Sequence, residues 1–473
     1  MLARRASSSV LVADAAIVGS GVIGNAIALE LSREAKLNVL VVDALPAAGS
    51  GSTSFSSGIL RTMYSVPDAA RFASEGASYF EGWRDYLEIP SFDADEEPTA
   101  TLSRCGGLIL RNPASADFLD KVLAAHEQVP GLEYEELTAN EIAARFPDMD
   151  AASCFSPLSR VDETTFGEIS NSARGNGGAY FPRTAYVADP QLAARDLANA
   201  ARRTGRTAFA YGARVVSVDR RRGADGALRV GGVSLADGRR VEAPIVVNAA
   251  GPFSSAITRM AFPSSSEEIA NDMRLTTRAM RQEVAYVPWR DAPGRLPLCS
   301  DLDAGIYFRP HGSDALLVGS TEPACDRPYL DVAIADPDEV QRPDGALAGL
   351  TDQWTNQVYR AALRLPNMPI PRAGESRGVA ACYDVTEDWM PIYDKSSLPG
   401  YYMAIGTSGN QFKCAGVAGR LMREIVVRNE TTGEDTDRSE WTFDLERTNG
   451  SIDPRAMFGR CRKVLETSGS VLG

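Results

Sequence analysis

Near its beginning the sequence contains Asp14-Ala-Ala-Ile-Val-Gly-Ser-Gly-Val-Ile-Gly-Asn25 and then Asn38-Val-Leu-Val-Val-Asp43. Gly19, Gly21 and Gly24 have the GxGxxG spacing that follows the first strand of a dinucleotide-binding fold. The first glycine permits a tight turn, the second lets the backbone approach a pyrophosphate, and the third lets a helix pack on the strand. This stretch therefore predicts a strand, a phosphate-binding turn, a helix and a second strand.

A helix and an acidic residue complete this pattern. We expect the helix to run from Val22 to Ser32, so that the free N–H groups of its first turn, including Ile23, face the phosphates. Asp43 lies nineteen residues beyond Gly24, where a carboxylate accepts hydrogen bonds from ribose hydroxyls. The pattern predicts a dinucleotide site but leaves NAD and FAD open.

Composition limits the remaining alternatives. The 473 residues are 44% hydrophobic and 23% charged, which is typical of a globular protein with two or more domains. A net charge of -13 argues against nucleic acid or an anionic membrane surface as a partner. The seven cysteines include no CxxC pair and favour a reducing compartment. We expect no membrane span and no metal site, and an oligomer is compatible with these features.

The first twelve residues contain Arg4, Arg5 and three consecutive serines, with no acidic residue. We expect a disordered leader in a cytoplasmic protein. The same composition is compatible with organelle targeting, which would place a eukaryotic protein in the mitochondrial matrix.

Two further regions extend the dinucleotide pattern. The small-residue loop Gly49-Ser-Gly-Ser-Thr-Ser-Phe-Ser-Ser-Gly58 suits close approach to phosphates and to a flat ring. A second dinucleotide-like block spans residues 174–254 and contains the expected strands Arg214–Val218 and Pro244–Gly251. Their distance from Gly24 implies that the nucleotide-binding sheet is assembled from separated pieces.

Later residues change to an antiparallel pattern. Apolar or alternating runs separated by turn residues predict strands at 280–288, 305–310 and 315–319. The segment 401–406 reads as a strand and 414–428 as a helix. From Asn429 onward the composition is polar, and we expect a tail packed on the surface.

Several separated stretches together resemble the FAD-dependent D-amino-acid oxidase superfamily, most closely its sarcosine and dimethylglycine oxidase or dehydrogenase branch. The stretches are Ile17–Asp43, Gly51–Tyr64, Val246–Gly251, Tyr307–Gly319, Tyr383–Pro391 and Gly406–Gly419. The resemblance implies FAD as cofactor and an α/β fold with an α+β second domain. An interrupted Rossmann-like FAD-binding domain of the glutathione-reductase type would be joined to an antiparallel-sheet substrate domain. We assign residues 1–88, 165–254 and 376–436 to the FAD-binding domain, 89–164 and 255–375 to the substrate domain, and 437–473 to the tail.

The resemblance also implies a substrate site. Ile59-Leu-Arg61 with Tyr64 resembles the segment that supplies an arginine to the substrate carboxylate, and Ser408–Lys413 resembles one whose lysine contacts the same group. A guanidinium and an ammonium would together hold one carboxylate. Tyr383 resembles a pocket tyrosine and Arg309 an arginine aimed at a substrate carboxylate, although either could be structural.

The expected cofactor-binding residues come from the glycine turn, the small-residue loop, the later strand ends and the segment before the last helix. They are Gly19, Gly21, Val22, Ile23, Gly24, Asp43, Ser52, Thr53, Ser54, Gly58, Ile59, Val216, Ala249, Ala250, Gly251, Gly409, Asn410, Gln411, Phe412 and Lys413.

Departures from the family pattern carry predictions of their own. Ala381 stands where monomeric sarcosine oxidases have the cysteine that tethers FAD, with Cys382 one place along. Phe55 stands where dimethylglycine-type enzymes have the tethering histidine. We therefore expect non-covalent FAD. Leu317 stands where monomeric sarcosine oxidases have the lysine of oxygen activation, which leaves oxygen and another electron acceptor equally open.

These features predict a flavoprotein oxidoreductase that oxidises the C–N bond of a small, carboxylate-bearing amine, secondary or N-methylated, to an imine that then hydrolyses. Hydride transfer from a neutral amine needs no histidine base, and we expect His126 and His311 at the surface. The alternatives are an α-hydroxy acid oxidase or dehydrogenase, and a flavin-bound assembly factor with little turnover.

Overall fold

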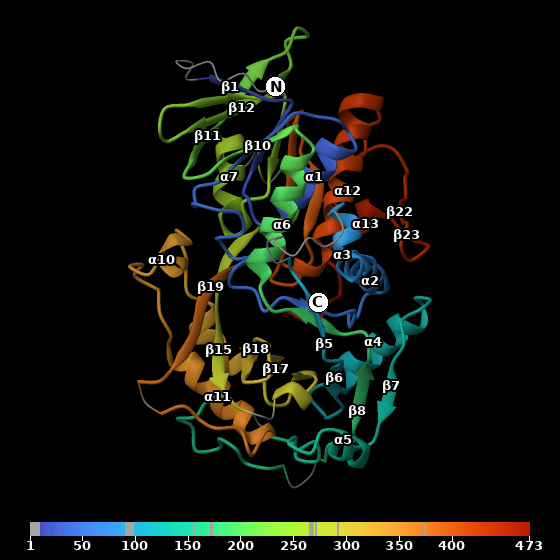
Figure 1. Cartoon of the computed structure of the whole chain (residues 1–473), viewed down its shortest axis with the longest axis vertical. Coiled ribbons are helices and arrows are strands. Elements are labelled where there is room, and N and C mark those ends of the chain that lie inside the picture. The colour runs from blue at the N-terminus through green and yellow to red at the C-terminus, as the bar shows by residue number, and fades with distance from the viewer. Residues whose placement is uncertain are drawn as a thin grey trace.

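The computed structural model describes residues 10–89, 99–155, 158–170, 174–263, 269, 272–290, 293–372 and 374–473. Most of the expected leader lies outside these residues. The molecule has two halves (Figure 1). One contains the six-stranded sheet that begins with the glycine-rich stretch, and the other contains an eight-stranded sheet.

The six-stranded sheet is parallel except at one edge. In spatial order it consists of β10 (Thr207–Ala210), β3 (Val39–Val42), β2 (Ala15–Val18), β14 (Ile245–Asn248), β21 (Tyr401–Ile405) and the antiparallel β20 (Ile392–Lys395). Strands β2, β3, β14 and β21 are buried throughout, because both faces of the sheet are covered. The prediction of a sheet assembled from distant segments is confirmed.

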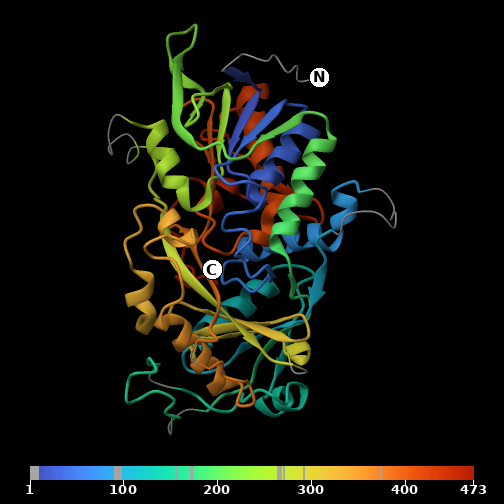
Figure 2. The ribbon, with the colours of Figure 1, turned by 60° about the vertical axis from the view of Figure 1, so that its left-hand side comes forward.

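Helices cover one face of this sheet, and a second sheet covers the other (Figure 2). The helical face carries α1 (Val22–Arg33), α6 (Pro190–Arg203) and α12 (Ala415–Val427). The opposite face carries α7 (Ser254–Ala261) and a four-stranded sheet of β1 (Val10–Val12), β13 (Arg240–Glu242), β12 (Leu228–Leu235) and β11 (Val215–Arg222). Alternate residues of each central strand enter the two cores: Ile17 packs with the helices and Val18 with the second sheet.

The expected strand at 214–218 corresponds to β11, but it lies in the four-stranded sheet. The strand from this region that joins the nucleotide-binding sheet is β10, which pairs with β3. Both are short runs before a turn, so local pattern does not decide which one reaches the parallel sheet.

The eight-stranded sheet forms the other half. Its spatial order is β19 (Arg377–Val385), β15 (Arg278–Pro288), β18 (Ala315–Ser320), β17 (Ile306–His311), β16 (Leu298–Asp301), β6 (Gly107–Leu110), β8 (Gly178–Phe181) and β7 (Glu135–Leu137). Every neighbouring pair is antiparallel except β16 with β6. The helix α11 (Asp352–Arg364) packs on this sheet through an apolar core. The predicted change to antiparallel strands is confirmed.

Two of these strands come from stretches that we assigned to the FAD-binding domain. Gly178–Phe181 pairs with β6 and β7, and Arg377–Val385 pairs along its whole length with β15. A short, buried apolar run such as Gly178–Phe181 reads the same in either sheet, and no local feature of the nine residues Arg377–Val385 identifies the strand they pair with. The sequence therefore could not assign these strands. The domain limits need to shift accordingly at residues 178–181 and 377–385.

Smaller elements lie between the two halves and in the C-terminal part of the chain. A three-stranded sheet of β4 (Ile59–Leu60), β9 (Ala185–Val187) and β5 (Leu102–Arg104) lies between the two large sheets. The remaining elements are α2 (Pro67–Glu81), α3 (Trp83–Tyr86), α4 (Ala116–Glu127), α5 (Ala139–Arg145), α9 (Arg327–Leu330), α10 (Asp338–Gln341), α13 (Pro454–Phe458), and the paired strands β22 (Phe443–Leu445) and β23 (Gly450–Ile452). No helix in the described ranges is both long and apolar enough to cross a bilayer.

The prediction of a surface tail is wrong for its last residues. Phe458 is fully buried, and Val471 and Leu472 are 8% and 5% exposed. The end of the chain marked C lies at the waist of the molecule, between the two halves (Figures 1 and 2). The tail is polar overall, but its few apolar residues enter the interior.

Candidate active site

A cavity of about 710 Å³ runs between the two halves. At one end it is lined by the glycine turn, Asp43 and Val216, and at the other by Arg61, Tyr383 and Lys413. The six-stranded sheet forms its base at β2 and β14, where the chain switches from one side of the sheet to the other. This is where open α/β sheets bind their ligands.

The glycine turn is held by contacts that leave no room for side chains. Gly19 has a φ of +110°, and an added Cβ would lie 2.3 Å from the carbonyl oxygen of Ala249. A Cβ on Gly24 would lie 2.0 Å from the carbonyl oxygen of Gly19. The first turn of α1 can therefore approach β2 and β14 closely, and its free N–H groups open into the cavity.

Asp43 stands at the end of β3 and faces the same cavity. Its two carboxylate oxygens accept hydrogen bonds from the backbone N–H groups of Ser20, at 2.6 Å, and Leu45, at 2.7 Å. Burial raises the pKa of this carboxyl, and the two N–H groups oppose the rise. The side chain is fixed where a ribose could meet it.

The small-residue loop lines the middle of the cavity. Thr53 accepts a hydrogen bond from the N–H of Val22 at 3.1 Å, and Ser52 donates one to the carbonyl of Cys382 at 2.9 Å. The loop thus joins the start of α1 to the eight-stranded sheet. Of the expected residues, Ser54 does not line the cavity, because its hydroxyl bonds back to the carbonyl of Gly51 at 2.8 Å.

Arg61 and Lys413 both line the cavity, and their charged groups lie over one tyrosine ring. Their charged groups lie 4.3 Å and 5.0 Å from the centre of the Tyr64 ring. Arg61 donates to the carbonyls of Met63 and Val471, and Lys413 donates to the carbonyl of Asn410. No carboxylate within the described residues forms an ion pair with either. Because a buried charge without a counter-ion is costly, this end of the cavity is suited to an anion.

The two cations also affect each other. Burial, followed by the charge of Arg61, lowers the pKa of Lys413 to about 7. Tyr64 does not itself line the cavity; its hydroxyl donates to the carbonyl of Asn410 at 3.1 Å. Tyr64 is therefore the aromatic support on which both cations rest.

Two tyrosines also line the cavity. Tyr383 lines the cavity, and its ring packs on Gly409, where an added Cβ would lie 2.5 Å away. Tyr307, which the sequence analysis did not single out, also lines the cavity and shares a hydrogen bond of 3.0 Å with Ser57. Burial raises the pKa of both Tyr307 and Tyr383. Because side chains alternate along a strand, Tyr307 lies on the same face of β17 as Arg309. This shared face is the sequence feature that could have identified Tyr307 as a cavity residue.

Arg309 does not reach the cavity. Its side chain donates to the carbonyl of Ser57 at 2.7 Å and lies 4.1 Å from the centre of the Tyr186 ring. These contacts hold the small-residue loop against β17, so the role of Arg309 is structural rather than in substrate binding. The histidines also differ from expectation: His126 is 1% exposed and His311 is half-buried.

Asp384 is a further buried carboxyl at the cavity wall. It accepts hydrogen bonds from the N–H of Gly406 at 2.6 Å and from Ser254 at 2.8 Å. Burial raises the pKa of Asp384 to about 7. The residue fixes the turn that precedes Gly409, and its only sequence signal was an acid within a buried strand.

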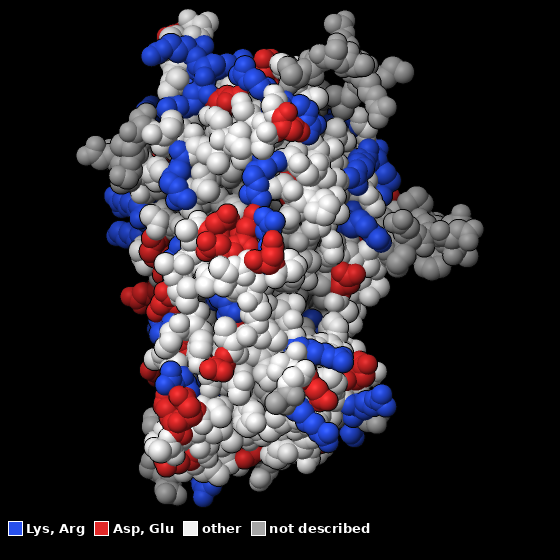
Figure 3. All heavy atoms as spheres, turned by 90° about the vertical axis from the view of Figure 1, so that its left-hand side faces the viewer, with Lys and Arg blue, Asp and Glu red and all other residues white. Residues whose placement is uncertain are grey.

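A segment of the eight-stranded half covers the cavity on one side. Residues 335–338, 341 and 342 line it, and Asp338 forms an ion pair of 2.7 Å with Arg214 of the other half. The hydroxyl of Ser52 also donates to Gln341 at 3.2 Å. Figure 3 shows this face, with acidic and basic side chains side by side at mid-height. No local sequence pattern indicates this cover, because it depends on packing between distant segments.

A family model described as FAD dependent oxidoreductase, DAO, matches residues 14–425. The chain belongs to this family. DAO proteins depend on FAD, so FAD is the cofactor, and the glycine turn, Asp43 and the small-residue loop of the cavity fit its dinucleotide part. In the described part of the chain, no cluster of His, Cys, Asp or Glu is arranged to hold a metal ion.

Solved structures agree with the DAO fold. L-proline dehydrogenase from P. horikoshii has a TM-score of 0.67 at 16% identity, covering 90% of this chain and 95% of its own. Glycine oxidase from Geobacillus kaustophilus has a TM-score of 0.64 at 21% identity, covering 89% and 96%. L-α-glycerophosphate oxidase from Mycoplasma pneumoniae, with FAD bound, has a TM-score of 0.61 at 15% identity, covering 88% and 94%. At these identities the likeness establishes the fold. A comparison with curated proteins returned no match.

The glycine turn provides the first test. Replacing Gly24 by Ala places a Cβ 2.0 Å from the Gly19 carbonyl oxygen, so α1 must move away from the phosphate-binding turn. We expect Gly24→Ala to be purified with little FAD, as measured by flavin absorbance per protein. Gly294→Ala, where a Cβ meets nothing within 4 Å, is the control. Full FAD content in Gly24→Ala would contradict the assignment.

The pKa of Lys413 gives a second prediction. Below a pH of about 7 the ammonium is charged, and above it the free amine cannot attract an anion. Nearby Cys414, whose pKa burial raises to about 11, stays neutral. The Kd of propionate, read from the flavin spectrum, should be constant below pH 7 and rise above it, by up to about tenfold per pH unit.

Lys413→Met is the control for this titration. Its propionate Kd should be higher than that of the parent at pH 6 and should vary little between pH 6 and pH 9. A parent protein whose Kd does not depend on pH would show that Lys413 does not bind the anion.

Proposed function

We propose that the protein oxidises the C–N bond of a small amino acid, preferably a secondary or N-methylated amine such as sarcosine. The observation that carries this proposal is the pair of buried cations, Arg61 and Lys413, at the far end of the cavity from Asp43. Two of the structural neighbours are named as enzymes that act on amino acids, L-proline dehydrogenase and glycine oxidase.

The residues divide into two groups in this proposal. The dinucleotide part of FAD is held by the glycine turn, Asp43 and the small-residue loop, and the flavin lies toward Tyr383 and the segment Gly409–Lys413. When bound, FAD supplies a two-electron acceptor for the hydride of the substrate carbon. The side chains of Arg61 and Lys413 bind the substrate carboxylate. Tyr307 and Tyr383 line the cavity beside the bound substrate.

The same cations favour the reactive form of the substrate. An amine that is to lose hydride equivalents must be neutral, and a positive charge nearby lowers its pKa. The pKa of Lys413 itself is lowered to about 7, first by burial and then by the charge of Arg61. A substrate amine bound beside these cations would have its pKa lowered in the same direction. The product imine then reacts with water to give the carbonyl compound and the amine.

Arg61→Met should retain FAD and raise the sarcosine Kd by roughly 100-fold, because one charge-assisted contact is lost.

A panel of ligands tests the proposed reaction. Under anaerobic conditions, sarcosine and other N-methyl amino acids should bleach the oxidised flavin band, whereas lactate and glycerol 3-phosphate should leave it unchanged. Bleaching by lactate alone would favour α-hydroxy acid oxidation. No bleaching by any small acid would favour a flavin-bound assembly factor.

We also propose that FAD is held without a covalent bond. Ala381 and Phe55, at the places where relatives tether the flavin, both line the cavity, and neither side chain can form such a bond. Burial raises the pKa of the neighbouring Cys382 thiol to about 12, so it is not a nucleophilic thiolate. Acid precipitation should release the flavin into the supernatant. A yellow pellet after washing in denaturant would contradict this proposal.

A further inference from the structure

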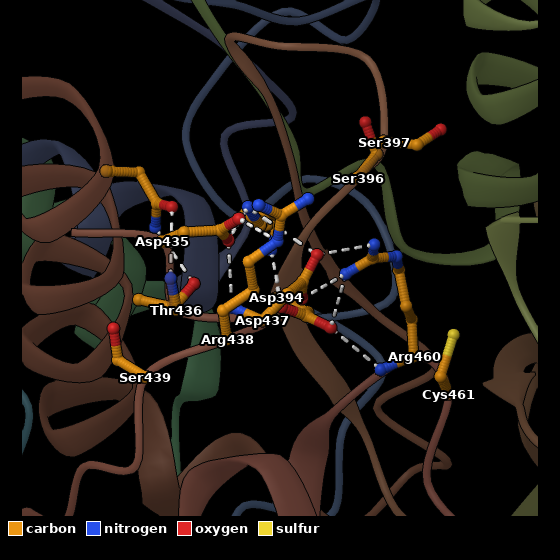
Figure 4. Close-up of polar contacts among 12 residues, drawn as sticks. Asp394, Ser396, Ser397, Asp435, Thr436, Asp437, Arg438, Ser439, Arg460 and Cys461 are labelled. Carbon is orange, nitrogen blue, oxygen red and sulfur yellow. Dashed lines mark hydrogen bonds and ion pairs between the residues drawn. The ribbon is translucent and has the colours of Figure 1, made fainter. Parts of the chain in front are cut away.

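The last residues of the chain enter the cavity from a fixed anchor. Arg460 forms ion pairs with Asp272 at 2.9 Å, Asp394 at 3.1 Å and Asp437 at 2.8 Å (Figure 4). Arg462, 1% exposed, is paired with the buried Asp388 at 2.7 Å. These ion pairs fix the chain beside β20, and the residues that follow lead back to the waist of the molecule.

Val471 is then held by its backbone between two charged side chains. Its N–H donates to the Oε2 atom of Glu322 at 2.9 Å, and its carbonyl oxygen accepts from Arg61 at 2.7 Å. The four atoms involved, from N through Cα and C to O, are the skeleton of an α-amino acid. Val471 therefore presents an amino-acid backbone to Arg61, the same residue that we propose binds the substrate carboxylate.

Glu322 has the properties of a binding group rather than of a structural ion pair. It adopts a φ of 57°, the left-handed region that a residue with a side chain seldom occupies and that is concentrated at functional sites. Its other oxygen accepts a hydrogen bond from Gln282 at 3.0 Å. No Lys, Arg or His in the described ranges forms an ion pair with it. Burial raises the pKa of Glu322 to about 8.

Glu322 is separated from the cavity only by its partners. Val471 and Gln282, which both bond to its carboxyl, line the cavity, whereas Glu322 does not. If residue 471 moved away, the carboxyl would face the cavity opposite Arg61. The side chain of Val471 packs with Met280, Val385 and Trp389, so an apolar wall lies beside this position.

We propose that Arg61 and Glu322 are the two ends of an α-amino-acid binding site, and that the Val471 backbone occupies this site until the substrate displaces it. Glu322 accepts the N–H of the substrate amino group as it now accepts that of Val471. This inference rests on the proposed function and deepens it, because it makes the amino group as well as the carboxylate a requirement for binding.

The exchange is favourable because of charge. Val471 offers a neutral N–H and a neutral carbonyl, whereas a free amino acid first binds to the same partners as an ammonium and a carboxylate. The ammonium then gives one proton to the Glu322 carboxylate, which leaves the neutral amine for hydride transfer. Charge-assisted hydrogen bonds are shorter and roughly twice as strong as neutral ones. A carboxylate without an amine gains at one end only, and an amine without a carboxylate gains only at the other. The site thus favours molecules that carry both groups.

Hydrogen exchange tests the displacement directly. The holoenzyme is held anaerobically with saturating sarcosine, with propionate, or without ligand, and ligand binding is read from the flavin spectrum. With sarcosine we expect amide exchange in residues 468–473 to become at least about tenfold faster, while the anchor around Arg460 and Arg462 is unchanged. Ligand binding with unchanged or slower exchange in this segment would overturn the inference and leave the proposed function intact.

A substitution tests the role of Glu322. At pH 9, above the pKa of the Glu322 carboxyl, Glu322→Gln should raise the sarcosine Kd about tenfold, because a charged acceptor is lost, and should leave the propionate Kd within about twofold. Glu136→Gln, at a side chain 64% exposed on β7, is the matched control. An equal change for both ligands, or no change for either, would overturn the inference. Failure of both ligands to bind the parent protein would overturn it together with the proposed function.

Discussion

The contact between Gly24 and Gly19 is the constraint on which the site depends. At 2.0 Å from the Gly19 carbonyl oxygen to where a Cβ would stand, only glycine lets α1 lie against β2. Gly19 of the same turn also packs closely against the backbone of Ala249, which follows β14 and lies more than two hundred residues away in the sequence. Helix, first strand and returning strand are thus locked at one point, and the free N–H groups of α1 are aimed into the cavity.

The parts of the fold that rest on local chemistry could be predicted from the sequence. The glycine spacing and the helix after residue 414 depend on residues close in the chain, and the structure has them where they were expected. The choice of sheet for β8 and β11 could not be predicted, because neither strand has a local pattern that identifies the distant strand it pairs with. The course of the tail depends on ion pairs that join Arg460 to residues of three other segments.

The same division applies to the site. Arg61 and Lys413 were expected to meet because each lay in a recognisable motif, and the structure brings both over Tyr64. Arg309 was also in a motif, but the loop at Ser57 takes its donors, and no local pattern reveals such a competing partner. Glu322 had no motif at all; what distinguishes it is an unusual backbone conformation and a partner at residue 471. Functional groups that depend on the meeting of distant segments are those that sequence patterns miss.

The segment that carries α10 affects how long the protein retains its FAD. It belongs to the eight-stranded half, yet it lies along the cavity and is tied across it by the Arg214–Asp338 ion pair and the Ser52–Gln341 hydrogen bond. A large cofactor beneath such a strap leaves more slowly while these two contacts hold. Flavin loss should therefore quicken when either contact is broken, and retention of the yellow colour becomes a measure of how well the strap is tied to the other half.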